Sequence, residues 1–417
     1  MLAKSGWKHS LTLATILISI SSLAFAQAGQ LDSTFGTGGI VTVNFGVLGD
    51  SGRATIGGAA IQFDGKIVVA GGIPDGNGHG LSSFAVARFL SNGSLDPTFG
   101  KNGIAAIAGS GGTYTSVVIQ PDGKIVAAGG QVARYNTNGA LDSSFGKKGV
   151  VSLGEFFLAT VVALEGNGDI LVGGNLIDSN GFVGRLLPNG TVDASFGLGQ
   201  LTPGITDIGV VTVTGLATLS NGDIVAGGNT GGALVAALTS GGQLDLNFGL
   251  NAQMFTPAAA AGLALGSNGD ILVAGTAYTD PTATGGTGFV LAGYQTVGIA
   301  DPSFGKNGGI ITALPNSSNA TASGSGIEPN GEIVVGGTAG VSGQSDFVLA
   351  RYTAQGQLDT SFGSNGTVET SFGSSEPTAN GLVIQPSDGK IIVFGGLITI
   401  VGGNQDTHLL MARYLAQ

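Results

Sequence analysis

The sequence predicts an all-β protein, a seven-bladed β-propeller of four-stranded antiparallel blades that is closed by its own two ends. Glycine supplies 78 of the 417 residues, which disfavours helices because Gly in a helix interior costs about 1 kcal/mol relative to Ala. One short motif recurs seven times, and a hairpin signal recurs seven times in the same order. Self-similarity of this kind is the signature of a repeat architecture.

Residues 1–26 predict a secretory signal peptide. Two lysines precede an apolar run over residues 11–23, and Ala24-Phe25-Ala26 supplies a small-x-small cleavage site. An N-terminal transmembrane anchor is the alternative, but the run is shorter than the ~20 residues that a span needs. We therefore expect residues 27–417 to be a single secreted domain, periplasmic or at the cell surface, with no integral membrane segment.

The net charge and the amino-acid composition limit the kinds of binding partner that we expect. The chain carries a formal net charge of −11, which becomes −13 once Lys4 and Lys8 leave with the signal peptide. An acidic surface repels phosphate backbones, so we expect no nucleic-acid partner. The sequence has no Cys, so its stability has to come from packing rather than disulfides. We expect a monomer whose ligand is an unidentified protein or glycan.

The recurring motif is Leu-Asp-x-x-Phe-Gly. Its copies are 46 to 64 residues apart, and each keeps the Asp and the Phe-Gly. The copies begin at Leu31, Leu95, Leu141, Val192, Leu244, Ala300 and Leu358.

The repeated aspartate has two readings. The seven residues are Asp32, Asp96, Asp142, Asp193, Asp245, Asp301 and Asp359. A ring of Ca²⁺ sites is one reading, but Ca²⁺ takes six to eight oxygens and one Asp per blade supplies too few. We favour a structural turn in which the carboxylate accepts backbone N–H bonds. We predict no metal site and no cofactor, with Ca²⁺ as the remaining alternative.

The second signal is an Asx-Gly dipeptide between apolar stretches, which is typical of a β-hairpin. The dipeptides begin at Asp64, Asp122, Asn167, Asn221, Asn268, Asn330 and Asp388. An alternating run such as residues 347–352 and a short stretch such as residues 366–370 complete each unit. Each repeat therefore predicts four strands, A to D, which is one propeller blade.

The phase of the repeat predicts how the ring closes. The mature chain starts with an isolated D strand at about residues 39–45 and ends with strands A, B and C, the last at about residues 408–415. Joining the two ends completes the seventh blade and leaves no open sheet edge.

The motifs Leu31-Asp32-Ser33-Thr34-Phe35-Gly36, Asp64-Gly65-Lys66-Ile67-Val68-Val69 and Phe347-Val348-Leu349-Ala350-Arg351-Tyr352 resemble the delta-60 repeat, a family of β-propeller-like bacterial repeats. The resemblance extends over about Leu31–Gln417. It weakens in the fourth and fifth copies, where Ala237 and Gly293 replace the Arg. It implies a propeller fold and secretion, and it transfers no activity or catalytic residue.

Two further sets of charged residues recur. Strand C carries Arg88, Arg134, Arg185, Arg351 and Arg413. We favour ion pairing with the repeated Asp over an anion site. The residue after Asx-Gly is Lys66, Lys124, Asp169, Asp223, Asp270, Glu332 or Lys390. This rim is therefore acidic on four consecutive blades, where a cationic partner is the alternative to a solvated turn.

The sequence contains no recognisable catalytic motif, so we predict no catalytic residue. No Cys is present, His79 and His408 are the histidines of the predicted mature chain, and neither has metal-ligand spacing. The sole Trp, a common sugar-stacking residue, is Trp7 in the predicted signal peptide.

Connection lengths indicate the functional face. The B–C and D–A connections vary in length and emerge on one face, and long ones gather in adjacent blades. Long B–C loops are expected at about residues 73–83, 276–288, 338–345 and 397–407. Long D–A loops are expected at about residues 46–55, 315–323 and 373–379.

Because binding residues concentrate on loops held by a rigid scaffold, we predict a binding surface there, with neutral length variation as the alternative. The candidates are Asp50, Arg53, Asp75, His79, Asp280, Glu376 and Asp406. The predicted function is a non-enzymatic extracytoplasmic binding scaffold. The alternative is a hydrolase or lyase with its site at the channel mouth on this B–C/D–A loop face.

Overall fold

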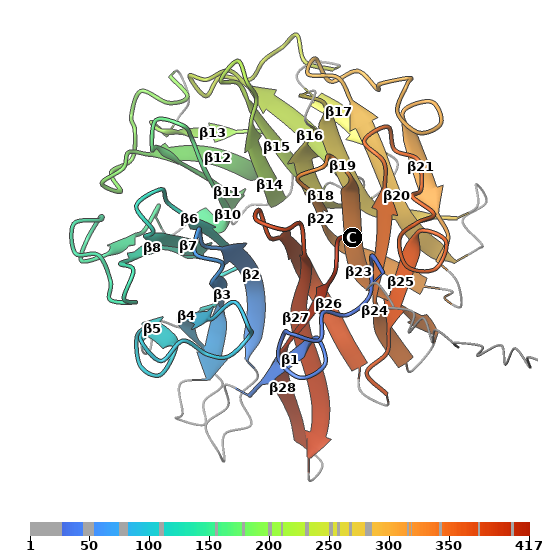
Figure 1. Ribbon diagram of the computed structural model, residues 1–417. Coiled ribbons are helices and arrows are strands. Elements are labelled where there is room, and N and C mark those ends of the chain that lie inside the picture. Colours follow the sequence, from blue (N-terminus) through green and yellow to red (C-terminus); the bar gives the residue numbers. More distant parts are fainter. Residues whose placement is uncertain are drawn as a thin grey trace, which may run out of the picture.

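The computed structural model is a ring of seven four-stranded antiparallel sheets, as the repeats predict (Figure 1). It describes residues 27–417 except for 45–53, 75–81, 108–111, 155–156, 177–179, 199–201, 210–211, 230–232, 250–252, 257–258, 267–268, 280–285, 315–316, 318, 342–343, 374–375 and 402–403. The predicted signal peptide lies outside the described residues.

Each blade runs from an inner strand A to an outer strand D. The A strands are β2 (Thr55–Ile61), β6 (Ser116–Ile119), β10 (Phe157–Leu164), β14 (Thr212–Thr218), β18 (Ala259–Leu265), β22 (Asn319–Ile327) and β26 (Glu376–Ile384). The B strands are β3 (Ile67–Pro74), β7 (Ile125–Gly129), β11 (Ile170–Leu176), β15 (Ile224–Asn229), β19 (Ile271–Tyr278), β23 (Ile333–Val341) and β27 (Ile391–Val401).

The outer half of each blade consists of strands C and D. The C strands are β4 (Ser82–Phe89), β8 (Gln131–Tyr135), β12 (Gly181–Leu186), β16 (Ala233–Leu238), β20 (Thr287–Tyr294), β24 (Gln344–Tyr352) and β28 (Asn404–Tyr414). The D strands are β5 (Ile104–Ile107), β9 (Val150–Val151), β13 (Ile205–Asp207), β17 (Gln253–Thr256), β21 (Gly309–Thr312), β25 (Thr367–Thr370) and β1 (Ile40–Val43). We number the blades 1 to 7 by their A strands, from β2 to β26.

The predicted closure is confirmed. Strand β1 pairs antiparallel with β28, from Ile40 opposite Ala412 to Val43 opposite Leu409, and so completes the sheet of β26 and β27. In Figure 1 the blue β1 lies beside the red β28. The A strands of successive blades contact one another around the whole ring, including β26 with β2. Both ends of the chain are therefore held in one blade.

The core lies between the blades, because each blade packs both faces against its neighbours. The β-branched B strands and the Ala-rich C strands are almost fully buried, and the buried clusters each draw residues from two successive blades. The innermost strands approach so closely that a Cβ on Gly57 would lie 1.9 Å from the Tyr114 carbonyl oxygen of the next blade. Small residues are thus required where the A strands converge.

Two of the predicted long loops are wrong. Residues 338–345 and 397–407 instead lengthen the B–C hairpins of blades 6 and 7, since Val341 pairs with Gln344 and Val401 pairs with Asn404. Strand formers such as Ile398-Thr399-Ile400-Val401 explain the difference, because β-branched residues favour a pleated ladder over a loop. The long B–C connections of blades 6 and 7 are therefore mostly regular sheet.

The same correction applies to two D–A connections. Strand β22 begins at Asn319 and β26 begins at Glu376, so the A strands take up part of the predicted loops 315–323 and 373–379. Among the described residues, no helix is long and apolar enough to cross a membrane.

Removing residues 27–44 should expose the edge of β28 and lower the melting temperature by about 10 °C, because several kcal/mol of strand pairing and packing are lost. Thermal melting followed by circular dichroism measures the loss. A synthetic peptide of residues 27–44 should restore the melting temperature, whereas a scrambled peptide should not. Unchanged melting of the truncated chain would show that the closing strand is dispensable.

Candidate functional site

The strand-C arginines make one repeated contact on the face that carries the A–B and C–D turns. Each guanidinium lies over the ring of the motif Phe, with its carbon 4.5 to 4.8 Å from the ring centroid. Its Nε donates to Oδ2 of the motif Asp at 2.8 to 2.9 Å. The pairs are Arg88 with Asp96, Arg134 with Asp142, Arg185 with Asp193, Arg351 with Asp359 and Arg413 with Asp32.

Each arginine also joins its blade to the next. Its Nη1 donates to a backbone carbonyl just after strand C of the following blade, and Arg351 of blade 6 reaches Ala416 of blade 7 in this way. The other acceptors are the carbonyls of Thr137, Pro188, Ser240 and Ser91. A stacked, bidentate guanidinium suits this position because it presents several donors in a fixed plane.

The motif Asp makes a turn in all seven copies. Its Oδ1 accepts the backbone N–H of the residue two positions later, at 2.9 to 3.0 Å. Burial alone would raise the pKa of Asp96, but hydrogen bonds from Thr98 and the charge of Arg88 hold it below its ordinary value. The carboxylates are thus engaged in local structure.

Rim charge differs between blades. In blades 3 and 6 one arginine faces three carboxylates, which are Glu165, Asp169 and Asp193 for Arg185, and Glu328, Glu332 and Asp359 for Arg351. In blades 2 and 7 a lysine joins the arginine at the motif Asp, as Lys124 does at Asp142. Burial raises the pKa of Glu328 to about 7, although the charge of Arg351 opposes the rise. Blades 3 and 6 therefore carry excess negative charge.

Blade 5 departs from the repeat at three positions that face inward. Gly293 stands where five blades have Arg, and Ala300 stands where five copies have Leu. Gly309 stands at a strand-D position that carries a larger side chain in the other six blades, which are Ile40, Ile104, Val150, Ile205, Gln253 and Thr367. Each change shortens a side chain, so blade 5 lacks volume that the other repeats fill.

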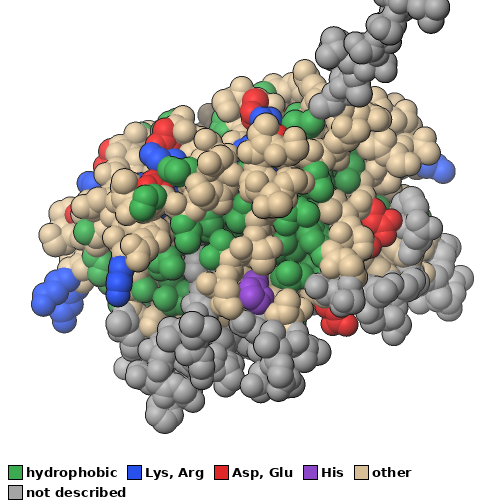
Figure 2. Space-filling view, turned by 60° about the horizontal axis from the view of Figure 1, so that its bottom comes forward, with side chains coloured by type: hydrophobic (Ala, Val, Ile, Leu, Met, Phe, Trp, Pro, Cys, Tyr) green, Lys and Arg blue, Asp and Glu red, His purple; other side chains and the backbone are tan. Residues whose placement is uncertain are grey.

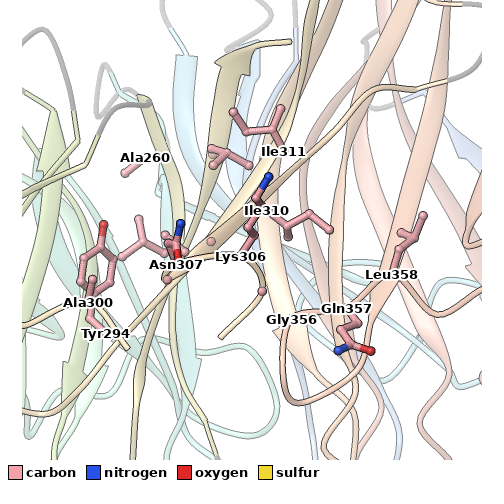
Figure 3. Close-up of a pocket in the computed structure, with 17 residues that line it drawn as sticks. Ala260, Tyr294, Ala300, Lys306, Asn307, Ile310, Ile311, Gly356, Gln357 and Leu358 are labelled. Carbon is pink, nitrogen blue, oxygen red and sulfur yellow. The ribbon is translucent and has the colours of Figure 1, made fainter. Parts of the chain in front are cut away.

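A cavity of about 690 Å³ lies where Ala300 and Gly309 leave space. Its buried lining includes Val273, Val290, Ala292 and Tyr294, and burial raises the pKa of the Tyr294 phenol. Figure 3 shows Tyr294 and Ala300 on one side of the cavity and Gln357 and Leu358 of blade 6 on the other.

The mouth of this cavity includes exposed groups. Ile311 is 48% exposed, and Lys306 and Asn307 are exposed beside it. The cavity thus combines a mainly apolar lining with one cation, a composition typical of ligand pockets. In Figure 2 hydrophobic side chains lie across the middle of the face in view, whereas acidic and basic side chains stand next to one another near its upper edge.

The predicted loop residues are not brought into one described site. Asp50, Arg53, Asp75, His79 and Asp280 lie outside the described residues. Glu376 is exposed at the start of β26, and Asp406 pairs with Thr399 in the extended hairpin of blade 7. That surface stays a prediction. Among the described residues, no three His, Cys, Asp or Glu side chains are grouped so that they could hold a metal ion.

Sequence reasoning missed the blade 5 cavity, although its signal was present. Gly293 replaces the strand-C Arg and Ala300 replaces the Leu that begins most motif copies, and both residues belong to blade 5. An alignment of the seven blades marks blade 5 as the one with the smallest side chains at positions 293, 300 and 309.

Comparison with protein families agrees with the fold. Residues 62–99, 120–145 and 328–362 match the family described as "Domain of unknown function (DUF5122) beta-propeller". These stretches contain the Asx-Gly hairpins and motif segments of blades 1, 2 and 6. The match supports a β-propeller repeat family of unknown function. No curated protein matches the chain.

Solved structures are similar in fold alone. The WD40 β-propeller domain of Doa1 aligns over 93% of this chain and 96% of that chain, with a TM-score of 0.50 and 11% identity. Sqt1 from Chaetomium thermophilum aligns over 88% and 87%, with a TM-score of 0.46 and 13% identity. The polysaccharide lyase Uly1 aligns over 87% and 90%, with a TM-score of 0.45 and 12% identity.

Replacing Arg88 by Ala should lower the free energy of unfolding by about 3–5 kcal/mol, because it leaves the buried Asp96 carboxylate without its cation. Adding Asp96→Asn should recover part of the loss, since Asn keeps the turn hydrogen bond without the charge. Urea denaturation measures both values. The exposed Lys147→Ala is the control, and a loss for Arg88→Ala no larger than for this control would contradict the structural role.

Replacing Glu328 by Gln should flatten the pH dependence of stability. A carboxyl whose pKa is about 7 in the folded chain and near 4.5 when unfolded costs stability as the pH rises between these values. From pH 5 to pH 8, Glu328→Gln should therefore gain about 1–3 kcal/mol relative to the unmodified chain. Gln385 already accepts a bond from Arg413 at the same position of blade 7, so the variant should fold. If urea denaturation gives the same stability difference between the variant and the unmodified chain at pH 5 and at pH 8, the raised pKa of Glu328 is refuted.

Proposed function

We propose that this chain is a non-enzymatic scaffold that binds a protein partner outside the cytoplasm. The observation that carries the proposal is the apolar cavity of blade 5, which opens beside the exposed Ile311 and Lys306. An apolar cavity with a polar rim suits a protrusion from a protein surface, where an apolar anchor supplies most of the binding energy. The repeat motifs further support kinship with delta-60 repeat proteins, and the predicted signal peptide supports export.

The charged rim favours binding over catalysis. Its arginines and motif aspartates are committed to contacts within and between blades, as described for Arg88 and Arg351. If one of these side chains acted in catalysis instead, it would have to give up contacts that hold neighbouring blades together. The cavity, by contrast, lies where the repeat has given up structural side chains, so an occupant there leaves the architecture unchanged.

A photo-crosslinking amino acid at Ile311 should capture a protein partner in cells that produce the exported chain. Thr42 is the matched control, because it is exposed at the same strand-D position of blade 7. The adduct should form at position 311, should be absent at position 42, and should be lost when Ala300→Leu fills the cavity. Val192→Leu, the same type of change in blade 3, should leave the adduct in place.

Two results would overturn the proposal. One is crosslinking to the same partner at positions 42 and 311, since the cavity would then have no special role. The other is turnover of a glycan or ester substrate that persists in the Ala300→Leu variant, because an enzyme would then act from another site.

A further inference from the structure

A second cavity of blade 5 lies where its arginine is missing. It has a volume of about 250 Å³ and is lined by Asp270, Asp301, Ser303 and Phe304 of blade 5 and by residues of blade 6 that include Ala354. Ser303 and Ala354 are exposed, whereas Phe304 is buried, so the cavity runs from the rim surface down to the aromatic ring. This second cavity has polar and charged lining residues, unlike the mainly apolar cavity at Ala300.

The backbone around this cavity is that of an arginine site. The Gly293 N–H donates to the Gly308 carbonyl, and its own carbonyl accepts the Asp301 N–H. Arg351 makes the same two backbone bonds, with Gly366 and Asp359, in blade 6. Blade 5 therefore keeps the backbone frame of the site. The Phe304 ring lies closer to strand C than the ring under an arginine can, because a Cβ on Gly293 would be 2.5 Å from its Cγ.

The groups that hold a guanidinium in five blades are all present. Phe304 corresponds to the ring under each arginine, and Asp301 corresponds to the carboxylate at its Nε. The carbonyl of Ala354 corresponds to the inter-blade acceptor, as Thr137 does for Arg88. Five occupied copies in the same chain thus define what this arrangement binds.

The hydrogen bonding of the Asp301 carboxylate differs from that of the aspartates that face an arginine. In the Arg-containing blades Oδ1 takes the turn hydroxyl and Oδ2 takes the guanidinium, whereas in blade 5 the Ser303 hydroxyl contacts both Oδ1 at 2.8 Å and Oδ2 at 2.9 Å. Among the described residues, no salt bridge to Asp301 is present. A hydroxyl can rotate back to Oδ1, which returns Oδ2 to an incoming cation.

The matching groove between blades 1 and 2 has balanced charge, because Lys66 pairs with Asp64 and Arg88 pairs with Asp96. It is lined by Arg88 and Lys66, next to Asp64 and Asp122. The blade 5 cavity has Gly293 and Asp270 at the positions of Arg88 and Lys66, so its charged lining residues are carboxylates. The same fold element thus holds paired charges between blades 1 and 2, whereas between blades 5 and 6 it is lined by carboxylates with no Lys or Arg among its lining residues.

We propose that the blade 5 cavity beside Asp301 binds the guanidinium of an arginine side chain presented by a bound protein. The guanidinium would stack on Phe304, pair with Asp301 and donate to Ala354, as Arg351 does with its own partners. The inference names a chemistry for the partner of the proposed scaffold and so rests on that function. Its test uses the purified chain alone, so either idea can fail without the other.

The test is titration of the purified chain with acetyl-arginine methylamide, followed by saturation-transfer NMR at low salt. Binding should be saturable in the millimolar range and should weaken at least about ten-fold in Asp301→Asn, because a charge-assisted pair is lost. Asp245→Asn is the matched control, since it alters the same turn in blade 4, and it should change affinity less than about two-fold. Acetyl-lysine methylamide should bind more weakly, because an ammonium does not reproduce the planar stack.

Three outcomes would overturn the inference. The first is no saturable binding of the arginine probe to the unmodified chain. The second is equal affinity in Asp301→Asn, which would place the probe elsewhere. The third is tighter binding of free arginine than of the amide, which would assign the cavity to a free small molecule instead of a side chain.

Discussion

The ring depends on one contact that is repeated at every junction between blades. The N–H of the Phe-Gly glycine donates to a backbone carbonyl in the C–D turn of the next blade, as Gly100 does to Asn138, and at the closing junction Gly363 donates to Ala28. The buried motif Phe lies directly beneath that turn, where a Cβ on Gly93 would lie 2.9 Å from the Phe35 ring. Glycine is therefore required on both sides of the junction, which explains why these columns of the repeat do not vary.

Against this constant frame the blades differ in what they add. Five blades use an arginine to connect the motif Asp, the Phe ring and the turn of the neighbouring blade. The charge of each of these arginines is paired within the fold. Blade 5 keeps the backbone bonds but loses side chains at Gly293, Ala300 and Gly309, and both cavities described above border it. The junction can lose the arginine because the backbone bond persists, since Gly305 still donates to Gln355. The same holds for blade 4, where Ala237 replaces the arginine and Gly249 still donates to Val297, so the backbone framework leaves two blades free to vary.

The sequence predicted the fold closely because the relevant signals are local. Asx-Gly turns, alternating strands and the isolated D strand near residues 39–45 each report on a few neighbouring residues, and their sevenfold recurrence fixes the architecture. The sites were harder to predict. The lengthened hairpins of blades 6 and 7 looked like loops because their Gly and Asn content resembles that of turns. The cavity at Ala300 depends on which side chains meet across a blade interface, and a substitution to a smaller residue carries no motif of its own. It becomes visible only when the other repeats serve as the reference.

The seam between the two ends has a consequence for how the chain reaches its final form. Asp32 receives its guanidinium from Arg413, and the carbonyls of Ala28 and Ala416 together stand in for a single turn of a complete blade. Synthesis proceeds from the amino terminus, so the first strand emerges long before the segment that shelters it. Six intervening blades have to be made while that strand waits, and the last few residues then complete the circle. Closure of the ring is thus a late event that requires synthesis to have continued as far as β28.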